Sequence, residues 1–269
     1  MTGHPFRFGL VSASARGEED WASQARRAED LGYSTLQVPD TLDTFAPLPA
    51  LAAAAAATTR LRVGSYVLAT ARREPEAVAW EAATLQVLTD GRLELGLGAG
   101  RPAARQEAER LGLRFGTAQQ RLDRLTATIA AVRQRSPDMA VLVAAQAPRA
   151  LTLAAQLADV VALGVPPNTD ETGLARAVST VRTAAGDRCP ELNLNLAVVG
   201  DQLPPWLATR IPGDLAGLDG TSVAVLRGSH AERRDTLQRR RDQLGISYIS
   251  CSAAFATELA PLVAELAGN

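Results

Sequence analysis

The sequence predicts a single (β/α)8 barrel, a TIM barrel, that spans residues 1–269. Eight short strand-like runs alternate with amphipathic helical stretches, and the length suits one barrel of about 250 residues. Hydrophobic residues make up 46% of the chain, which is enough for a large core. Strands that alternate with helices are expected to be parallel, because each helix carries the chain back to the start of the next strand. A doubly wound open sheet is the alternative architecture.

The predicted strands are short runs separated by helical patterns, in which apolar residues recur at spacings of three and four. The alanine run 52–57 predicts a helix packed closely on the barrel, because alanine is small and the best helix former. The tail Ala253–Ala267 is expected to form the last helix. The eight strands are expected at Phe6–Val11, Thr35–Pro39, Leu61–Leu68, Arg92–Leu97, Met139–Ala144, Asp159–Leu163, Leu192–Val199 and Ile246–Cys251.

The alternation of side chains along the strands predicts what lies inside the barrel. Leucines at 93, 95 and 97 alternate with Glu94, and successive side chains on a strand point to opposite faces. If the leucines face the outer helices, Glu94 and Arg62 of the neighbouring strand lie inside. A buried carboxylate needs a partner, so we expect a structural ion pair between Arg62 and Glu94 at the bottom of the barrel.

Composition excludes several classes of function. The 28 basic residues are all arginine, and the absence of lysine excludes Schiff-base chemistry and a Walker-type phosphate site. A net charge of −1 gives no sign of a nucleic-acid or membrane partner. The two histidines and two cysteines form no group with metal-ligand spacing, so no metal site is expected. No signal peptide is apparent, and a cytoplasmic location with free thiols is expected.

The active site of such a barrel is expected at the carboxyl ends of its strands. The most informative segment there is Gly96-Leu97-Gly98-Ala99-Gly100, which follows a strand directly. It is not a dinucleotide fingerprint, because the third glycine of that motif would fall at Arg101. The glycines allow either close approach of a flat ring or phosphate, or simple packing of the strand end.

Four segments resemble the luciferase-like monooxygenase superfamily, and within it the short coenzyme F420-dependent oxidoreductases. They are LQVPD at 36–40, LPALAAAAAATTRLRV at 48–63, EAATLQVLTDGRLELGLGAG at 81–100 and GISY at 245–248. The resemblance implies a luciferase-like barrel with coenzyme F420, or alternatively FMN, across its mouth. It also implies an oxidoreductase or monooxygenase that acts on a small organic substrate by hydride transfer or oxygenation.

Carried over by position, the resemblance assigns residues to the cofactor and the substrate. The cofactor ring would lie on Tyr66, Val67 and Leu68, with a non-proline cis peptide in that segment, and near the glycine turn at Gly98, Ala99 and Gly100. The cofactor phosphate would lie on Ala145, Gln146 and Ala147, before a helix that begins at Pro148. Ring and substrate contacts would come from Asp40, Thr41, Tyr66 and Arg101.

The sequence also departs from the family pattern. Thr41 and Arg101 stand where many relatives have histidine and glutamate, and Ala-Ala-Gln replaces a run of glycines at the phosphate loop. The insertion before the fifth strand is nearly absent, since residues 136–138 lead straight to Met139. These changes leave open a cofactor-free family member that serves as a partner subunit or binding protein, and a homodimer is possible in either case.

Some single residues keep two interpretations. Asp40 could orient the substrate or cap a loop, and Arg101 could pair with an anionic ligand or form a surface salt bridge. Cys251 ends the last strand and is expected to be a small core residue rather than a nucleophile. The arginine-rich stretch 233–241 is expected to be a solvated helix face.

Overall fold

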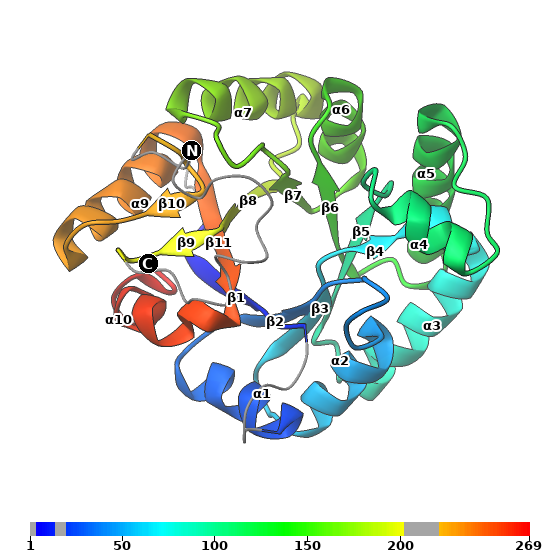
Figure 1. Ribbon diagram of the computed structural model, residues 1–269, viewed down its shortest axis with the longest axis horizontal. Coiled ribbons are helices and arrows are strands. Elements are labelled where there is room, and N and C mark those ends of the chain that lie inside the picture. Colours follow the sequence, from blue (N-terminus) through cyan, green and yellow to red (C-terminus); the bar gives the residue numbers. More distant parts are fainter. Residues whose placement is uncertain (1–3, 14–19, 202–220) are drawn as a thin grey trace.

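The chain forms a closed parallel barrel surrounded by helices (Figure 1). The structure is a computed structural model and describes residues 4–13, 20–201 and 221–269. Its main sheet has the order β3-β2-β1-β11-β8-β7-β6-β5-β4, and a further pairing of β3 with β5 closes the barrel. β3 and β4 are two parts of one predicted strand. Counted together, they give the barrel the eight parallel strands of the expected fold.

All eight predicted strands are confirmed, with two local differences. The third predicted strand is divided at Tyr66–Val67, and the seventh ends at Leu196, after which β9 pairs with β10 in a separate two-stranded parallel sheet. The strands are β1 Arg7–Val11, β2 Thr35–Val38, β3 Arg62–Ser65, β4 Leu68–Ala69, β5 Leu93–Gly98, β6 Ala140–Ala145, β7 Val160–Leu163, β8 Glu191–Leu196, β9 Val198–Val199, β10 Val225–Leu226 and β11 Ile246–Ser252.

The helices return the chain along the outside of the barrel and cover its outer surface (Figure 1). The alanine run lies in α2 as expected, and the predicted last helix starts with the 3-10 turn η3. The helices are α1 Trp21–Asp30, α2 Pro47–Ala56, η1 Thr70–Arg72, α3 Pro75–Leu88, α4 Ala104–Arg110, α5 Ala118–Arg135, α6 Pro148–Leu157, α7 Glu171–Ala185, α9 His230–Leu244, η3 Ala253–Phe255 and α10 Ala256–Leu266.

The main hydrophobic core lies between the strands and the helices. Leu93, Leu95 and Leu97 are fully buried in it, which confirms that the leucines of β5 face outward from the barrel. Cys251 belongs to the same core, so its thiol points away from the barrel interior, as expected for a core cysteine.

The arginine-rich stretch lies on α9, where most arginines are surface residues but Arg240 is buried and pairs with Glu171. No helix among the described residues is long and apolar enough to cross a membrane.

Candidate active site

The interior of the barrel holds a continuous chain of polar side chains instead of a purely apolar filling. At its lower end, Glu94 accepts hydrogen bonds from Arg7 at 2.7 Å and from the Tyr248 hydroxyl at 3.0 Å. Arg7 also pairs with Glu191 at 2.6 Å, and its guanidinium lies 3.7 Å from the centre of the Tyr248 ring. Burial alone would lower the pKa of Arg7, but the two carboxylates raise it above its ordinary value, so the cation is firmly held.

The expected ion pair between Arg62 and Glu94 is not present. The prediction that Glu94 lies inside the barrel with an arginine partner is correct, but the partner is Arg7. Gly64, and not Arg62, is level with Glu94 in the pairing of β3 with β5. Arg62 therefore lies one layer lower, where its guanidinium donates to the backbone oxygen of Leu93 at 3.2 Å.

The polar chain continues upward from Glu94 to Tyr66 at the mouth. The Tyr66 hydroxyl donates to Asn193 at 2.7 Å, and the Asn193 amide donates to Ser250 at 2.9 Å. Ser250 donates to Gln37 at 2.8 Å, and Gln37 donates to the Tyr248 hydroxyl at 2.9 Å. Each group in this chain donates to the next, and the last acceptor is Glu94. The Tyr66 side chain is thereby fixed in one orientation.

The segment predicted to support a cofactor ring has the expected backbone feature. The Tyr66–Val67 peptide bond is cis, and both side chains pack with Leu142 and Ala162 in a cluster inside the barrel. The Leu68 side chain is fully buried in the outer core, so only its backbone is left to contact a ligand at the mouth. Tyr66 and Val67 are therefore the side chains that this segment presents to the mouth.

The glycines of β5 make room for the chain itself. A Cβ on Gly96 would lie 1.9 Å from the backbone oxygen of Ser65, and one on Gly98 would lie 2.7 Å from Val67. Gly100 has a φ of +88°, and its turn packs on Phe115. The absence of a Cβ at Gly96 and Gly98 thus allows the close approach of Ser65 and Val67, which fits the packing interpretation of this segment.

Asp40 is held in a buried ion-pair cluster. Its carboxylate lies 2.9 Å from Arg72 and 3.0 Å from Arg73, and it accepts a hydrogen bond from the backbone amide of Ala69 at 2.9 Å. Arg72 is almost fully buried and also pairs with Glu107 at 2.5 Å. Both Asp40 oxygens are thus engaged, which favours the loop-anchoring interpretation over direct contact with a substrate.

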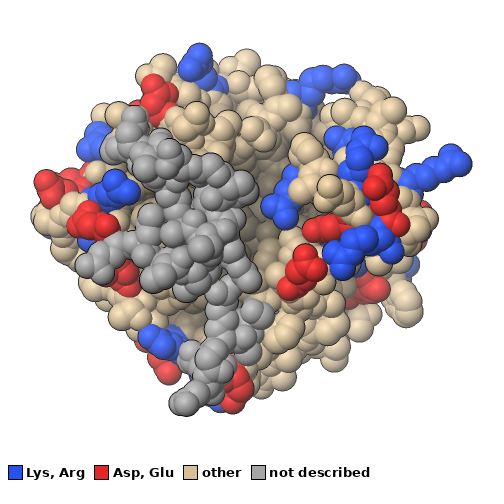
Figure 2. All heavy atoms as spheres, in the orientation of Figure 1, with Lys and Arg blue, Asp and Glu red and all other residues tan. Residues whose placement is uncertain are grey.

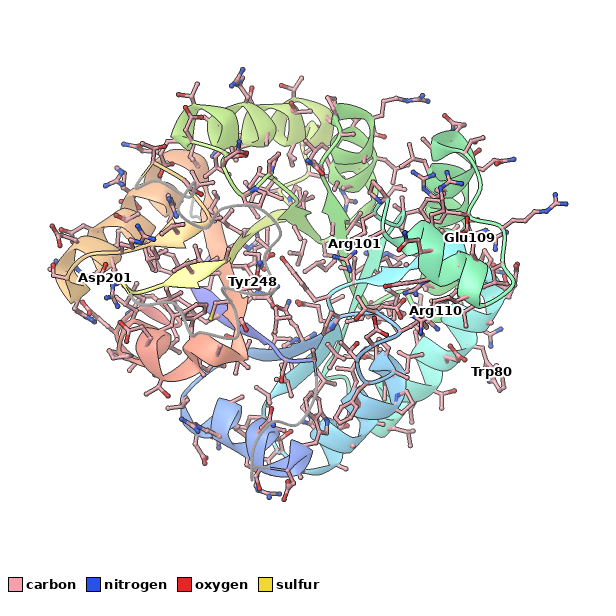
Figure 3. All side chains as sticks on the ribbon, in the orientation of Figure 1. Trp80, Arg101, Glu109, Arg110, Asp201 and Tyr248 are labelled. Atoms are coloured by element: carbon pink, nitrogen blue, oxygen red, sulfur yellow. The ribbon has the colours of Figure 1, made fainter. Side chains whose placement is uncertain are left out.

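The other predicted substrate residues lie at or near the mouth. Figures 1 and 2 look onto the end of the barrel where the strands finish, and Figure 2 shows a hollow near the centre of this face. Figure 3 shows Arg101 beside that centre, and Arg101 is exposed and forms no ion pair within the described residues. The Thr41 hydroxyl lies 3.0 Å from that of Thr44, within the loop after β2. Asn195, which shares the inner face of β8 with Asn193, is exposed at this end and was not assigned a role from the sequence.

The predicted phosphate segment follows β6 and leads into α6. Ala145 is buried in the outer core, so only its backbone could approach a ligand, whereas Gln146 and Ala147 are exposed. Ala147 is the N-cap of α6 and offers no side-chain acceptor to the amides of the first turn. The backbone N–H groups of that turn have no partner within the helix. This helix start can therefore bind an anion.

The described residues contain no group of three or more His, Cys, Asp or Glu side chains that could hold a metal ion.

The polar chain itself could have been found from the sequence in part, because Arg7 alternates with Phe6 and Phe8 just as Glu94 alternates with its leucines. The pairing of side chains across the barrel depends on their height, which alternation does not give.

Comparison with known proteins supports the same fold. Residues 6–136 match the luciferase-like monooxygenase family. The chain is 36% identical over 110 residues to an F420-dependent glucose-6-phosphate dehydrogenase from Nakamurella multipartita. That match covers 37% of this chain and 32% of the relative, so the chain corresponds to about a third of that protein's length.

Two solved structures have the same fold over nearly the whole chain. The coenzyme F420-dependent tetrahydromethanopterin reductase from Methanopyrus kandleri has a TM-score of 0.75 at 15% identity and covers 98% of this chain and 99% of its own. The oxygenating constituent of 3,6-diketocamphane monooxygenase from Pseudomonas putida, in complex with FMN, has a TM-score of 0.72 at 14% identity, with 98% and 96% covered.

Proposed function

We propose that this chain is an oxidoreductase that binds coenzyme F420 at the mouth of its barrel, because its residues 6–136 match the luciferase-like monooxygenase family. FMN is the alternative cofactor. The observation that carries the proposal is the start of α6, where exposed backbone amides follow a barrel strand and Ala147 leaves them without a side-chain cap. The names of an F420-dependent relative and of an FMN-bound barrel support this choice of cofactors.

The start of α6 suits the phosphate of such a cofactor. Two helices that begin at this end are capped by side chains, α5 by Thr117 and α7 by Asp170, whereas α2 and α3, like α6, begin without a side-chain cap. At α6 the N-cap is alanine, so an incoming phosphate can accept the hydrogen bonds that a cap would otherwise take. The Arg149 side chain is held away by Gln119 at 2.6 Å, which leaves the backbone as the binding group.

Tyr66 and Val67 would support the flat ring of the cofactor. The two side chains form an apolar surface with Leu142 and Ala144 inside the barrel. The hydrogen bond to Asn193 prevents Tyr66 from rotating, so a ring placed against it meets a fixed surface. Bound there, a reduced deazaflavin or flavin would supply the hydride transfer or oxygenation chemistry, which the protein's side chains cannot supply themselves.

The substrate would enter from the open side of the mouth, beside Arg101 and Thr41. Arg101 has no ion-pair partner among the described residues and offers a planar donor group to an anionic or carbonyl oxygen. Asp40 would act as a positioning residue, because it fixes Arg72, Arg73 and the backbone of Ala69 at the end of β4. The substrate is proposed to be a small organic molecule with an oxygen that Arg101 can bind.

A second candidate is a binding protein or partner subunit without a cofactor. Two observations favour it: Leu68 and Ala145, assigned to the cofactor by position, are buried away from the mouth, and Asp40 is fully engaged. In this case the barrel would bind a small molecule without redox chemistry.

The experiment is a fluorescence titration of the purified protein with coenzyme F420 and with FMN, using matched changes at the α6 N-cap. Ala147→Asn and Ala147→Asp both supply a side-chain cap and should stabilise α6 by about 1 kcal/mol. Only Asp adds a negative charge beside the phosphate, so it should abolish binding while Asn weakens it less. Binding that survives Ala147→Asp would contradict this phosphate site. No binding to either cofactor by the unchanged protein would favour the cofactor-free candidate.

A further inference from the structure

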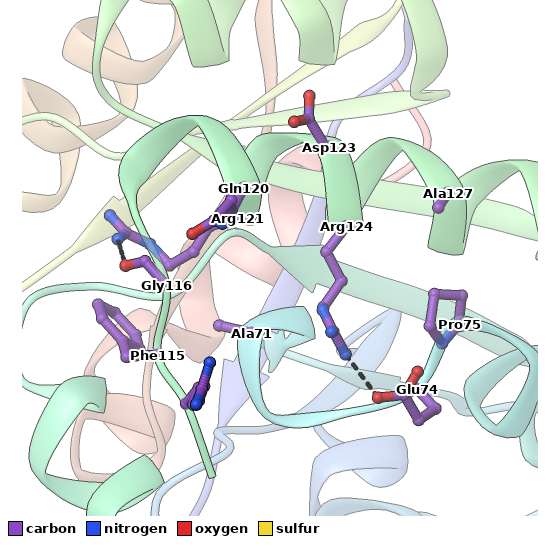
Figure 4. A pocket seen from close by; sticks show the side chains of 11 residues that line it. Ala71, Glu74, Pro75, Phe115, Gly116, Gln120, Arg121, Asp123, Arg124 and Ala127 are labelled. Carbon is purple, nitrogen blue, oxygen red and sulfur yellow. Dashed lines mark hydrogen bonds and ion pairs between the residues drawn. The ribbon is translucent and has the colours of Figure 1, made fainter.

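A second pocket lies outside the barrel mouth, between the start of α3, the turn η1 and the first turns of α5 (Figure 4). Its cavity volume is about 590 Å³. The residues that line it include none of those assigned above to the cofactor or substrate. Its polar wall carries Arg114, Arg121 and Arg124, and its apolar wall is formed by Ala71, Pro75, Phe115 and Ala127.

Arg121 is the central cation of this pocket, and the protein does not pair all the hydrogen-bond donors of its guanidinium. Its guanidinium lies 4.3 Å from the centre of the Phe115 ring, and Arg105 approaches the same ring at 5.3 Å. One nitrogen of Arg121 donates to the backbone oxygen of Gly116 at 3.1 Å, but its Nε is buried without a hydrogen-bond partner. Burial and the nearby positive charge of Arg105 lower the pKa of Arg121, so the charge lacks compensation.

The acidic residues nearby do not neutralise this cation. Glu74 pairs with Arg124 at 2.8 Å, as Figure 4 shows, and Asp123 accepts a hydrogen bond from Gln119 at 2.6 Å. Within the described residues, Arg105, Arg114 and Arg121 form no ion pair with any carboxylate. Two guanidinium groups, those of Arg105 and Arg121, thus lie over the Phe115 ring, and Arg114 lines the same pocket without an ion pair to a described carboxylate.

We propose that this pocket binds the phosphate group of a small phosphate monoester. Arg114 and Arg121 would bind its oxygens, since the planar guanidinium fork matches a tetrahedral oxyanion and a doubly charged phosphate matches two cations. The start of α5 adds a favourable field, because the positive end of a helix dipole lies at its N-terminus. The carbon-bearing part of the ligand would lie against Ala71, Pro75 and Ala127. The proposal is independent of the cofactor and concerns a site that the cofactor does not use.

The test is a calorimetric titration with inorganic phosphate and with glycerophosphate at constant ionic strength, in the Ala147→Asp variant, whose α6 site is blocked. Saturable binding of both is expected. Arg114 is exposed, so Arg114→Gln should not disturb folding. This variant should weaken phosphate binding several-fold. In the double variant with Arg121→Gln, the loss of phosphate affinity should exceed about tenfold. Arg176→Gln, an exposed residue of α7 with the same charge change, is the matched control and should have no effect.

Folding and binding are separated by a thermal melt without phosphate. Removing the incompletely satisfied Arg121 should leave the melting temperature unchanged or raise it, while the rise in melting temperature caused by phosphate disappears. The proposal is wrong if the double variant binds phosphate as well as the control does. It is equally wrong if the unchanged pocket binds no phosphate, or if chloride at equal ionic strength stabilises the protein to the same extent.

Discussion

Arg7 and Glu94 meet inside the barrel with 2.7 Å between the guanidinium Nη1 and the carboxylate Oε2, although 87 residues separate them in sequence. The Glu94 side chain is almost fully buried, and Arg7 is only partly exposed. The pair joins β1 to β5 across the interior, and Tyr248 of β11 shares the same carboxylate. Three strands that are distant in the chain are thus held by one charged group.

Removal of this carboxylate should destabilise the fold. We expect Glu94→Ala to lower the free energy of unfolding by about 3 kcal/mol, because Arg7 and the Tyr248 hydroxyl lose a buried partner. Denaturant unfolding measures this change. The control is Glu76→Ala, which removes an exposed partner of Arg135 and should cost no more than about 0.5 kcal/mol. Equal stability of the two variants would show that the Glu94 carboxylate is not buried in an ion pair.

The tyrosine hydroxyls should lose their protons only at a pH at which the protein unfolds. The chain has three tyrosines, and burial raises the pKa of Tyr33, Tyr66 and Tyr248 above the ordinary value, with Glu94 adding to the effect at the last two. In the unfolded chain tyrosine titrates near pH ~10. Burial of the neutral phenols therefore contributes a free energy of folding that is fully present below that pH. This contribution decreases as the pH rises above it, because the unfolded chain then loses its phenol protons first.

The tyrosinate absorbance of the folded protein therefore should not rise near pH ~10 and should appear together with loss of the folded circular dichroism signal. The chain in denaturant provides the control, with an ordinary titration of all three residues. An absorbance step near pH ~10 that leaves the fold intact would mean that at least one phenol is accessible.

The two cysteines should differ strongly in reactivity. Cys189 is exposed, whereas Cys251 is fully buried, and burial raises the pKa of its thiol to about 12. Because the thiolate is the reactive form, a thiol reagent at neutral pH should modify one thiol quickly in the folded protein and both in denaturant. Cys189→Ser should remove the fast reaction. If the fast reaction persists in Cys189→Ser, Cys251 must be accessible from the surface.

The hydroxyl of Tyr66 should contribute to stability more than to ring binding. We expect Tyr66→Phe to cost about 1–2 kcal/mol, because the buried Asn193 oxygen loses its donor while the ring remains. Tyr66→Ala should reduce both stability and cofactor binding, since the apolar surface is lost as well. Denaturant unfolding and the F420 titration measure the two effects. A Tyr66→Phe protein of unchanged stability would indicate that the polar chain is not continuous.

Alternation of residue types was sufficient to predict the fold but only part of the site. The leucines of β5 and the alternating Phe8 and Leu10 of β1 identify the outward faces, because burial against helices requires apolar side chains every second residue. The same rule correctly predicted that Glu94 lies inside. It failed for Arg62, because the choice between Arg62 and Arg7 depends on the relative heights of β3 and β1 around the barrel.

The roles of individual mouth residues were harder to predict because they depend on contacts between distant segments. Nothing local to Asp40 shows that Arg72 and Arg73 would surround its carboxylate. Likewise, the glycines at 96 and 98 suggested room for a ligand, but Ser65 and Val67 occupy that room once the two strands pair. The cis peptide at Tyr66–Val67 was expected only from family resemblance.

The order of donors and acceptors from Tyr66 to Glu94 has a consequence for a molecule bound in the mouth. The hydroxyl protons of Tyr66, Ser250 and Tyr248 are all committed to acceptors within the barrel. The Tyr66 oxygen is the first donor of this chain, and the Glu94 carboxylate is the last acceptor. With its proton committed to Asn193, that oxygen can only accept. A molecule in the mouth is therefore stabilised when it turns a hydroxyl or ring N–H toward Tyr66, and repelled when it turns a carbonyl there.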